Sequence, residues 1–177
     1  MSGARTRLNF RSTYCRTNFV RAVQTIEVSI DVMWEFVSNQ LPQKNFVKWW
    51  KDNTQPSGPP WKIKIIKENP PMKWDVSVLC HAILSCKDPG LKLNKSQKKS
   101  VEKLGEIRNK KLFHRSAAQI DFEEYVEVLR ESMESYKGLL DEDHRLLHVK
   151  RLEDINNREI YILYVKVLCA ALITKPR

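Results

Sequence analysis

Three residues near the middle of the chain have the types and spacing that phosphate chemistry uses. Arg108 is followed directly by Asn109, and His114 comes after four further residues, in the stretch EIRNKKLFH. A guanidinium binds a phosphate through two parallel hydrogen bonds. An imidazole takes up or releases a proton near neutral pH, and an amide can orient the pair. The three residues together suggest a site that binds a phosphodiester.

A purely structural role for the same residues is the alternative. At about 100° per residue, Arg108 falls within the apolar face of a helix that also carries Leu104 and Leu112. A buried guanidinium is costly unless it is paired, so Arg108 could simply neutralise an acid of the helix that follows. His114, near a helix end, could do no more than bind the last carbonyl groups. Both interpretations stay open at this point.

The charges around this motif are unevenly distributed. Residues 92–115 carry nine Lys or Arg and two Glu, whereas residues 116–144 carry nine Asp or Glu and two basic residues. Two successive helices of opposite sign could pack antiparallel with complementary rims. The whole chain has 31 Lys and Arg against 21 Asp and Glu, a formal charge of +10, which favours an anionic partner and nucleic acid first. The basic residues nominated for nucleic-acid contact are Lys98, Lys99, Lys103, Lys110, Lys111 and Arg115.

Four main helices are expected to position these residues. Apolar residues at three- and four-residue steps predict helices over 18–41, 75–87, 96–113 and 121–140. Asn18, Asp75 and Asp121 are the predicted N-caps, and Asp121 with Glu124 forms a capping box. The buried seam expected on the fourth helix is Phe122, Tyr125, Leu129, Met133, Tyr136 and Leu140.

The segment between the first two main helices is expected to be a long loop. A short turn of helix at 45–51 precedes the turn-rich stretch DNTQPSGPPW, and KIKIIK alternates like a short strand. The segment is rich in tryptophan, which we expect to anchor the loop in the core, with stacking on nucleic-acid bases as the alternative. The tryptophans concerned are Trp49, Trp50, Trp61 and Trp74.

The remaining features exclude several classes of protein. The longest apolar run, at 160–174, is interrupted by Lys166 and is shorter than the roughly 20 residues of a membrane span, so no transmembrane segment is expected. This run is compatible with either strand or helix. The four cysteines match neither a disulfide framework nor a zinc spacing, so no metal or cofactor is expected. These features predict a cytoplasmic or nuclear protein, with a mitochondrial presequence in the Arg-rich N-terminus as the alternative.

The motif and its surroundings resemble the HEPN superfamily. The stretch EIRNKKLFH resembles the R-N-x4-H form of the HEPN signature. WDVSVLCHAILSC at 74–86, the Lys-rich connection, the motif helix and the capped helix after it are similar to the HEPN-like domains of DAZ-interacting zinc-finger ubiquitin ligases. They also resemble an uncharacterised animal family named for a human X-chromosome open reading frame. The resemblance covers about 74–140, and 18–41 would be the family's first helix. The second family carries cysteines before its second helix that look zinc-binding, whereas residues 45–73 contain none.

The resemblance implies a fold and an activity. It implies an all-α, four-to-five-helix HEPN-like bundle over 18–156, between a basic arm at 1–17 and an apolar tail at 157–177. It also implies a homodimer through the motif helix, with RNA as partner. Active members resemble metal-independent endoribonucleases in which a ribose 2′-hydroxyl attacks the adjacent phosphate. Arg108 would stabilise the phosphorane, Asn109 would position groups, and His114 would act as acid and base. Other members are catalytically silent, so a protein-interaction or dimerisation module is the alternative.

Overall fold

The computed structural model describes the backbone of residues 3–41, 46–54, 58–70, 73–113 and 120–173. Side chains are described for residues 15–41, 48–54, 58–70, 73–113 and 120–157. Within these ranges the regular elements are helices, and an isolated bridge pairs Thr54 with Cys86. The prediction of an all-α fold is confirmed.

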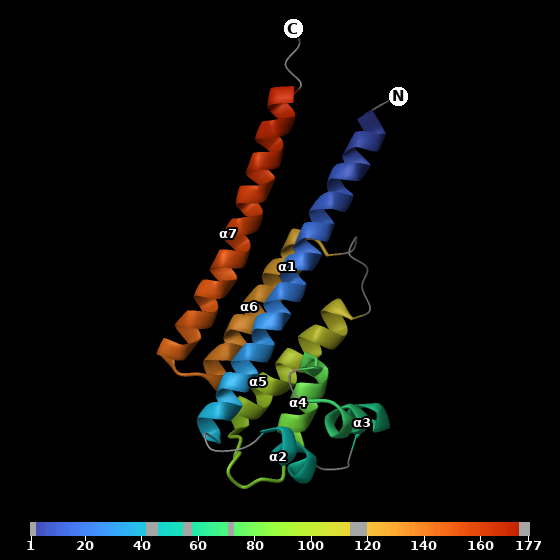
Figure 1. Cartoon of the computed structure of the whole chain (residues 1–177). Helices are drawn as coiled ribbons and strands as arrows, with labels where there is room; N and C mark the ends of the chain where they lie inside the picture. The colour runs from blue at the N-terminus through green and yellow to red at the C-terminus, as the bar shows by residue number, and fades with distance from the viewer. Residues whose placement is uncertain (1–2, 42–45, 55–57, 71–72, 114–119, 174–177) are drawn as a thin grey trace.

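Long helices form the body of the molecule, and both ends of the chain lie at the same end of it (Figure 1). The first helix runs down the length of the molecule and the last runs back up, and two others lie beside them. These helices are α1 (Gly3–Gln40), α5 (Lys95–Glu106), α6 (Phe122–Leu139) and α7 (Glu142–Ile173). The apolar run at 160–174, which sequence alone left open between strand and helix, is helical up to Ile173.

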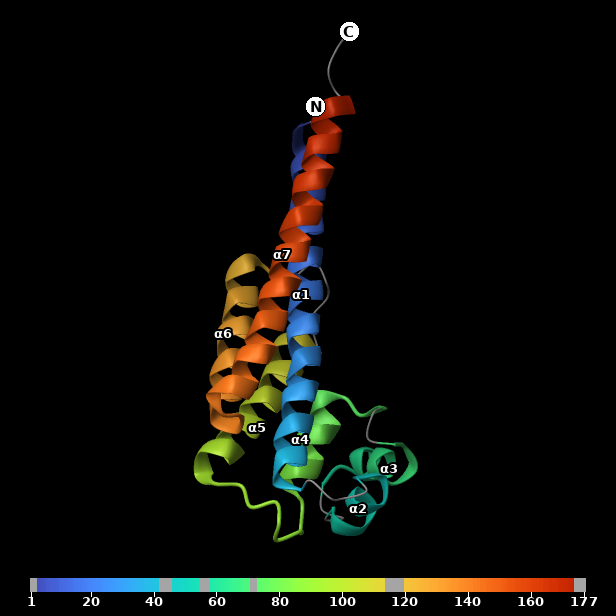
Figure 2. The same cartoon turned by 60° about the vertical axis from the view of Figure 1, so that its left-hand side comes forward.

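Three shorter helices lie around the end of the molecule opposite the termini (Figure 2). They are α2 (Phe46–Asn53), α3 (Pro60–Glu68) and α4 (Val76–Leu84). The short helix expected at 45–51 is confirmed as α2, but the strand expected at KIKIIK is wrong, because these residues belong to α3. The segment predicted as one long loop therefore contains two helices.

Two prolines explain why α3 forms where an alternating pattern indicated a strand. Pro60 occupies the first turn, where its fixed φ favours the helix and its missing N–H costs nothing. The helix ends at Glu68 because Asn69, which precedes Pro70, is extended (φ −113°, ψ 145°). An alternation over six residues is too short to distinguish the two structures, and the helix buries Ile66.

A cluster of tryptophans closes the core at this end. Trp50 is fully buried, and its ring centroid lies 4.5 Å from that of Trp49, 5.6 Å from that of Trp74 and 6.1 Å from that of Trp34. The contacts join α2 to α1 and to the start of α4. Core anchoring is thus confirmed for Trp49, Trp50 and Trp74, whereas Trp61 on α3 is 50% exposed.

Two of the three predicted N-caps are confirmed. The Asp75 side chain accepts a hydrogen bond from the N–H of Val78, and Asp121 forms the expected capping box with Glu124. The third is wrong, because Asn18 is fully buried inside α1. Residues 4–41 contain neither Gly nor Pro, so nothing interrupts the helix before the Asn18 position.

The buried seam of α6 differs in part from the predicted one. Phe122, expected in the seam, is 49% exposed, while Val128 and Ser132 are buried. Tyr125 and Tyr136 are buried as expected, and the Tyr136 hydroxyl lies 2.9 Å from Oγ of Ser29 and 3.1 Å from the carbonyl oxygen of Thr25. Since both of these partners lie on α1, α6 is fixed to that helix by polar as well as apolar contacts.

Candidate functional site

The candidate site forms where the N-terminus of α4 meets η2 (Ile107–Leu112), the π-helical segment that continues α5. Asp75, the N-cap of α4, accepts a hydrogen bond from the N–H of Val78 through Oδ1 (2.9 Å). Its other oxygen, Oδ2, lies 2.5 Å from Nη2 of Arg108. The structural alternative left open by the sequence, a pair between Arg108 and an acid of the following helix, is replaced by this pair with Asp75. The carboxylate that pairs with Arg108 comes from the helix before it.

The π-helical backbone places Phe113 over Arg108. The N–H of Phe113 donates to the carbonyl oxygen of Arg108 (3.0 Å), a hydrogen bond that spans five residues. A π turn brings residues five apart to the same side, whereas in an α-helix they would diverge by about 140°. Cζ of Arg108 consequently lies 4.2 Å from the ring centroid of Phe113, within the range of a cation–π contact.

Asn109 contacts the same guanidinium from its other edge. Nη1 of Arg108 donates to Oδ1 of Asn109 (3.0 Å). A carboxylate, an amide and an aromatic ring thus hold the Arg108 side chain, which remains 20% exposed. The helix face beneath it is apolar as predicted, and its buried members are Val101, Leu104, Gly105 and Leu112.

A groove of about 440 Å³ opens beside Arg108. One wall comes from α1, and the other from the start of α4 and the end of η2. The walls are mostly apolar, and their charged members are Glu27, Asp75 and Arg108. The apolar lining consists of Phe19, Val23, Ile26, Ile30, Val76, Leu112 and Phe113. Such a groove can accept an apolar or aromatic group next to a fixed positive charge.

The structure brings together two of the three predicted catalytic residues. Arg108 and Asn109 are in direct contact, whereas His114 lies outside the described residues. The same holds for Arg115, one of the basic residues nominated for nucleic-acid contact.

Two lysines of the motif helix are paired with acids of α6. Nζ of Lys103 lies 2.8 Å from Glu131, and Nζ of Lys111 lies 2.8 Å from Glu127 and 3.0 Å from Glu131. Burial acts to raise the pKa of Glu131, but hydrogen bonds from both lysines outweigh it and hold that pKa below its usual value. The predicted complementary rims are therefore confirmed. Two of the nominated lysines, Lys103 and Lys111, serve to join helices.

The other nominated lysines are more exposed. Lys98 and Lys99 lie on the outer face of α5, and Lys110 is 3.4 Å from Glu106 one turn away on its own helix. Surface pairs of this kind are weak, so these three lysines stay accessible to an anion.

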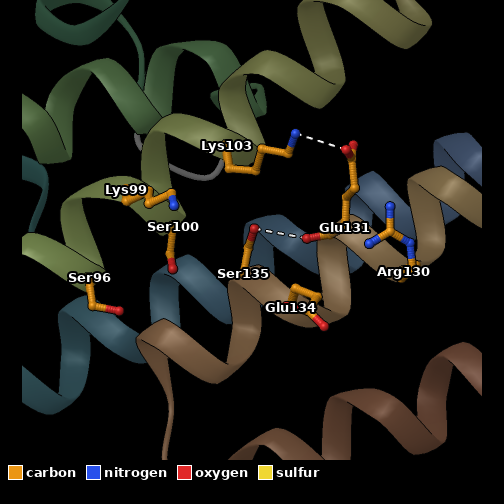
Figure 3. A pocket seen from close by; sticks show the side chains of 8 residues that line it. All are labelled: Ser96, Lys99, Ser100, Lys103, Arg130, Glu131, Glu134 and Ser135. Carbon is orange, nitrogen blue, oxygen red and sulfur yellow. Dashed lines mark hydrogen bonds and ion pairs between the residues drawn. The ribbon is translucent and has the colours of Figure 1, made fainter.

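A cleft of about 460 Å³ lies between α5 and α6 (Figure 3). The Lys103–Glu131 ion pair spans it, and the Ser135 hydroxyl donates to the backbone carbonyl of Glu131 (2.9 Å). Its charged lining consists of three basic residues and two acids, and one of those acids, Glu131, is already paired with Lys103. The lining residues are Ser96, Lys99, Ser100, Lys103, Arg130, Glu131, Glu134 and Ser135.

A smaller pocket of about 310 Å³ lies on the other side of the motif, against α3 and α4. Asn109 and Lys62 both line it, so the Arg108–Asn109 pair lies on the wall between this pocket and the apolar groove. Nζ of Lys62 donates to the carbonyl oxygen of Ser77 (3.1 Å), and burial lowers the pKa of Lys62. The sequence indicates the Lys-rich stretch 44–73 as a candidate for phosphate contact, but it does not single out Lys62 within it.

A second inward arginine was also missed. Arg21 on α1 is buried, and its guanidinium lies 5.8 Å from the ring centroid of Tyr125. Among the residues that the structure describes, its Nε and both polar atoms of the neighbouring Asn18 have no hydrogen-bond partner. The signal available in the sequence was its spacing, because Asn18, Arg21 and Thr25 fall at three- and four-residue steps on one helix face.

The described part of the chain contains neither a metal-type cluster of His, Cys, Asp and Glu side chains nor a helix suited in length and apolarity to a bilayer. The cysteines whose side chains are described, Cys15, Cys80 and Cys86, are free thiols. Burial raises the pKa of Cys80 to about 12, which keeps this thiol protonated.

Comparison with known proteins assigns neither a family nor a function to the chain. Neither a family model, nor a curated protein, nor a solved structure matches the chain.

Proposed function

We propose that this chain is a HEPN-like, RNA-directed domain whose Arg108 and Asn109 contact an RNA phosphate. One observation supports this proposal above the others: the guanidinium is oriented by Asp75 and Asn109 at the edge of an open groove. A positioned, partly exposed guanidinium can bind a phosphate without first being ordered. The free thiols fit a reducing compartment, so we place this role in the cytoplasm or nucleus.

Cleavage would require His114 in addition. In the mechanism that the resemblance implies, His114 takes the proton of a ribose 2′-hydroxyl as that oxygen attacks phosphorus. It then gives a proton to the 5′-oxygen as the bond between phosphorus and the 5′-oxygen breaks. Arg108 would stabilise the charge that develops on the phosphoryl oxygens. No metal takes part in this mechanism, and the products are a 2′,3′-cyclic phosphate and a 5′-hydroxyl.

The test is a single-turnover incubation with a labelled, structured RNA in excess EDTA. The variants are Arg108→Ala and His114→Ala, with Lys137→Ala, at an exposed lysine on α6 that was not nominated for RNA contact, as the control. We expect cyclic-phosphate products with the parent chain and the control, and at least a hundredfold less with each motif variant. Circular dichroism checks that each variant is folded. Equal cleavage by all four proteins would refute catalysis at this motif.

The alternative, a catalytically silent dimerisation module, is supported by a different observation. Phe113 is 62% exposed at the mouth of the apolar groove, and Val20 on α1 is 45% exposed. If this face joins two copies of the chain, Phe113→Ser should shift the sedimentation coefficient from dimer to monomer. Val126→Ser, at an exposed apolar position on α6, is the control and should leave the coefficient unchanged. A parent chain that sediments as a monomer at all concentrations would exclude this function.

A further inference from the structure

Trp61 is an exposed tryptophan in a protein that buries the others. Trp49, Trp50 and Trp74 are buried and Trp34 packs against the core, whereas Trp61 is 50% exposed on α3. An indole is among the most costly side chains to leave in water. Its exposure therefore points to a partner surface.

One lysine lies over this ring, and two more are exposed on the same helix. Nζ of Lys62 lies 5.4 Å from the ring centroid of Trp61, and its hydrogen bond to the Ser77 carbonyl oxygen holds it there. Lys64 and Lys67 are exposed on the same helix, which carries a single acid, Glu68. The surface of α3 thus combines an aromatic face with excess positive charge, which is complementary to a base and its phosphate.

This surface is continuous with the candidate site. Lys62 lines the same pocket as Asn109, which is hydrogen-bonded to Arg108. Lys62 also interacts electrostatically with both Asp75 and Arg108. A strand whose phosphate contacts Arg108 would therefore meet the amine of Lys62 next, and the indole of Trp61 after it.

We infer that α3 is a stacking platform for an unpaired base of single-stranded RNA, with Trp61 as the stacking face and Lys62 as a phosphate contact. This inference rests on the proposed function and deepens it, because it names the form of RNA that the site accepts. A paired base has no exposed face for the indole, so the platform selects loops and single strands over continuous duplex.

The test measures fluorescence anisotropy of two labelled RNAs, a single strand and a blunt duplex of equal length. Trp61→Ala should weaken single-strand binding roughly tenfold and leave duplex binding unchanged. Trp61→Phe retains an aromatic face and should recover most of the affinity, which a purely structural role would not predict. Val126→Ser is the control for loss of an exposed apolar side chain elsewhere, and the melting temperature of each variant checks its folding.

The remaining outcomes overturn the inference in distinguishable ways. Unchanged single-strand affinity in Trp61→Ala, with a loss in Arg108→Ala, would remove the platform but keep the proposed function. An equal loss for strand and duplex would reduce Trp61 to a general structural role. A loss in Trp61→Ala with none in Arg108→Ala would keep the platform and refute the phosphate role of Arg108. Trp61-dependent binding of an acidic peptide, without Trp61-dependent RNA binding, would assign the surface to a protein.

Discussion

The two sides of the α5–η2 helix place their ion pairs in different surroundings. On the side that faces α6, Lys103 and Lys111 meet Glu127 and Glu131, and the pairs join two packed helices. On the side that faces α4 and α1, Arg108 is also paired with one carboxylate, but this pair lies at the edge of an open apolar groove. A count of lysines therefore overstates the positive charge available to a ligand. Accessible charge depends on where the acids of neighbouring helices lie.

The largest loss of stability should follow substitution of Asp75 on the groove side, because this residue both caps α4 and pairs with Arg108. Asp75→Ala removes the N-cap of α4 and leaves Arg108 without its carboxylate, so we expect the free energy of unfolding to fall by about 2 kcal/mol. Asp75→Asn keeps a capping oxygen but loses the charge, and it should cost about half as much. Urea denaturation of both variants measures the difference. Equal losses would mean that the ion pair with Arg108 accounts for the whole effect and that the cap contributes nothing.

On the α6 side, close packing of the two helices should be the next most sensitive feature. A Cβ at Gly138 would lie 2.1 Å from Oγ and 3.2 Å from Cβ of Ser100. Gly138→Ala should therefore destabilise the fold by about 1.5 kcal/mol, although alanine is the better helix former. Adding Ser100→Ala removes the closer contact and should restore most of the loss. A single variant as stable as the parent chain in thermal unfolding would show that the helices move apart easily.

The ion-pair network on the α6 side should give a smaller and pH-dependent effect. Glu131→Gln weakens two charged hydrogen bonds, and we expect a loss of about 1 kcal/mol at pH 7. Because the folded-state pKa of Glu131 is lowered, its contribution is complete above the unfolded pKa of about 4.3 and is lost as the pH falls through the folded pKa. Parent and variant should therefore converge in stability at low pH. Convergence at high pH instead would contradict this sign.

The smallest effect should come from the exposed pair on η2. Lys110 and Glu106 are mostly exposed and 3.4 Å apart, so Lys110→Ala should change the unfolding free energy by less than about 0.5 kcal/mol. If Lys110→Ala costs as much stability as Glu131→Gln, an exposed lysine pair contributes as much as the pairs between α5 and α6. The distinction between exposed and paired lysines would then be wrong.

Features fixed by local hydrogen bonding were predicted best from the sequence. The caps at Asp75 and Asp121 depend on residues three positions away, so the local sequence identifies them. Asn18 has the same cap-forming chemistry, but an uninterrupted helix passes through it. Whether such a residue caps a helix or is buried within it depends on tertiary packing. The exposure of Phe122 depends on packing in the same way.

The candidate site was predicted in part for the same reason. The apolar face around Arg108 follows from helical periodicity, and the opposite charges of α5 and α6 are visible as segment totals. The pairing of Arg108 with Asp75 joins residues 33 positions apart and depends on how α4 packs beside η2. No periodicity encodes that contact. The π-helical turn is likewise invisible to a pattern search that assumes 3.6 residues per turn.

That turn has a consequence for changes in chain length. A π turn holds one more residue than an α turn, so the segment 107–112 could lose one residue and still continue as a helix. After such a deletion Phe113 would stand four residues from Arg108, about 40° from it around an α-helix, so the residues beyond the deletion would keep their side of the helix. Phe113 would stay beside the guanidinium, and the groove would keep its aromatic wall. The π turn is therefore a place where the chain accommodates one residue more or less without losing the fold or the site.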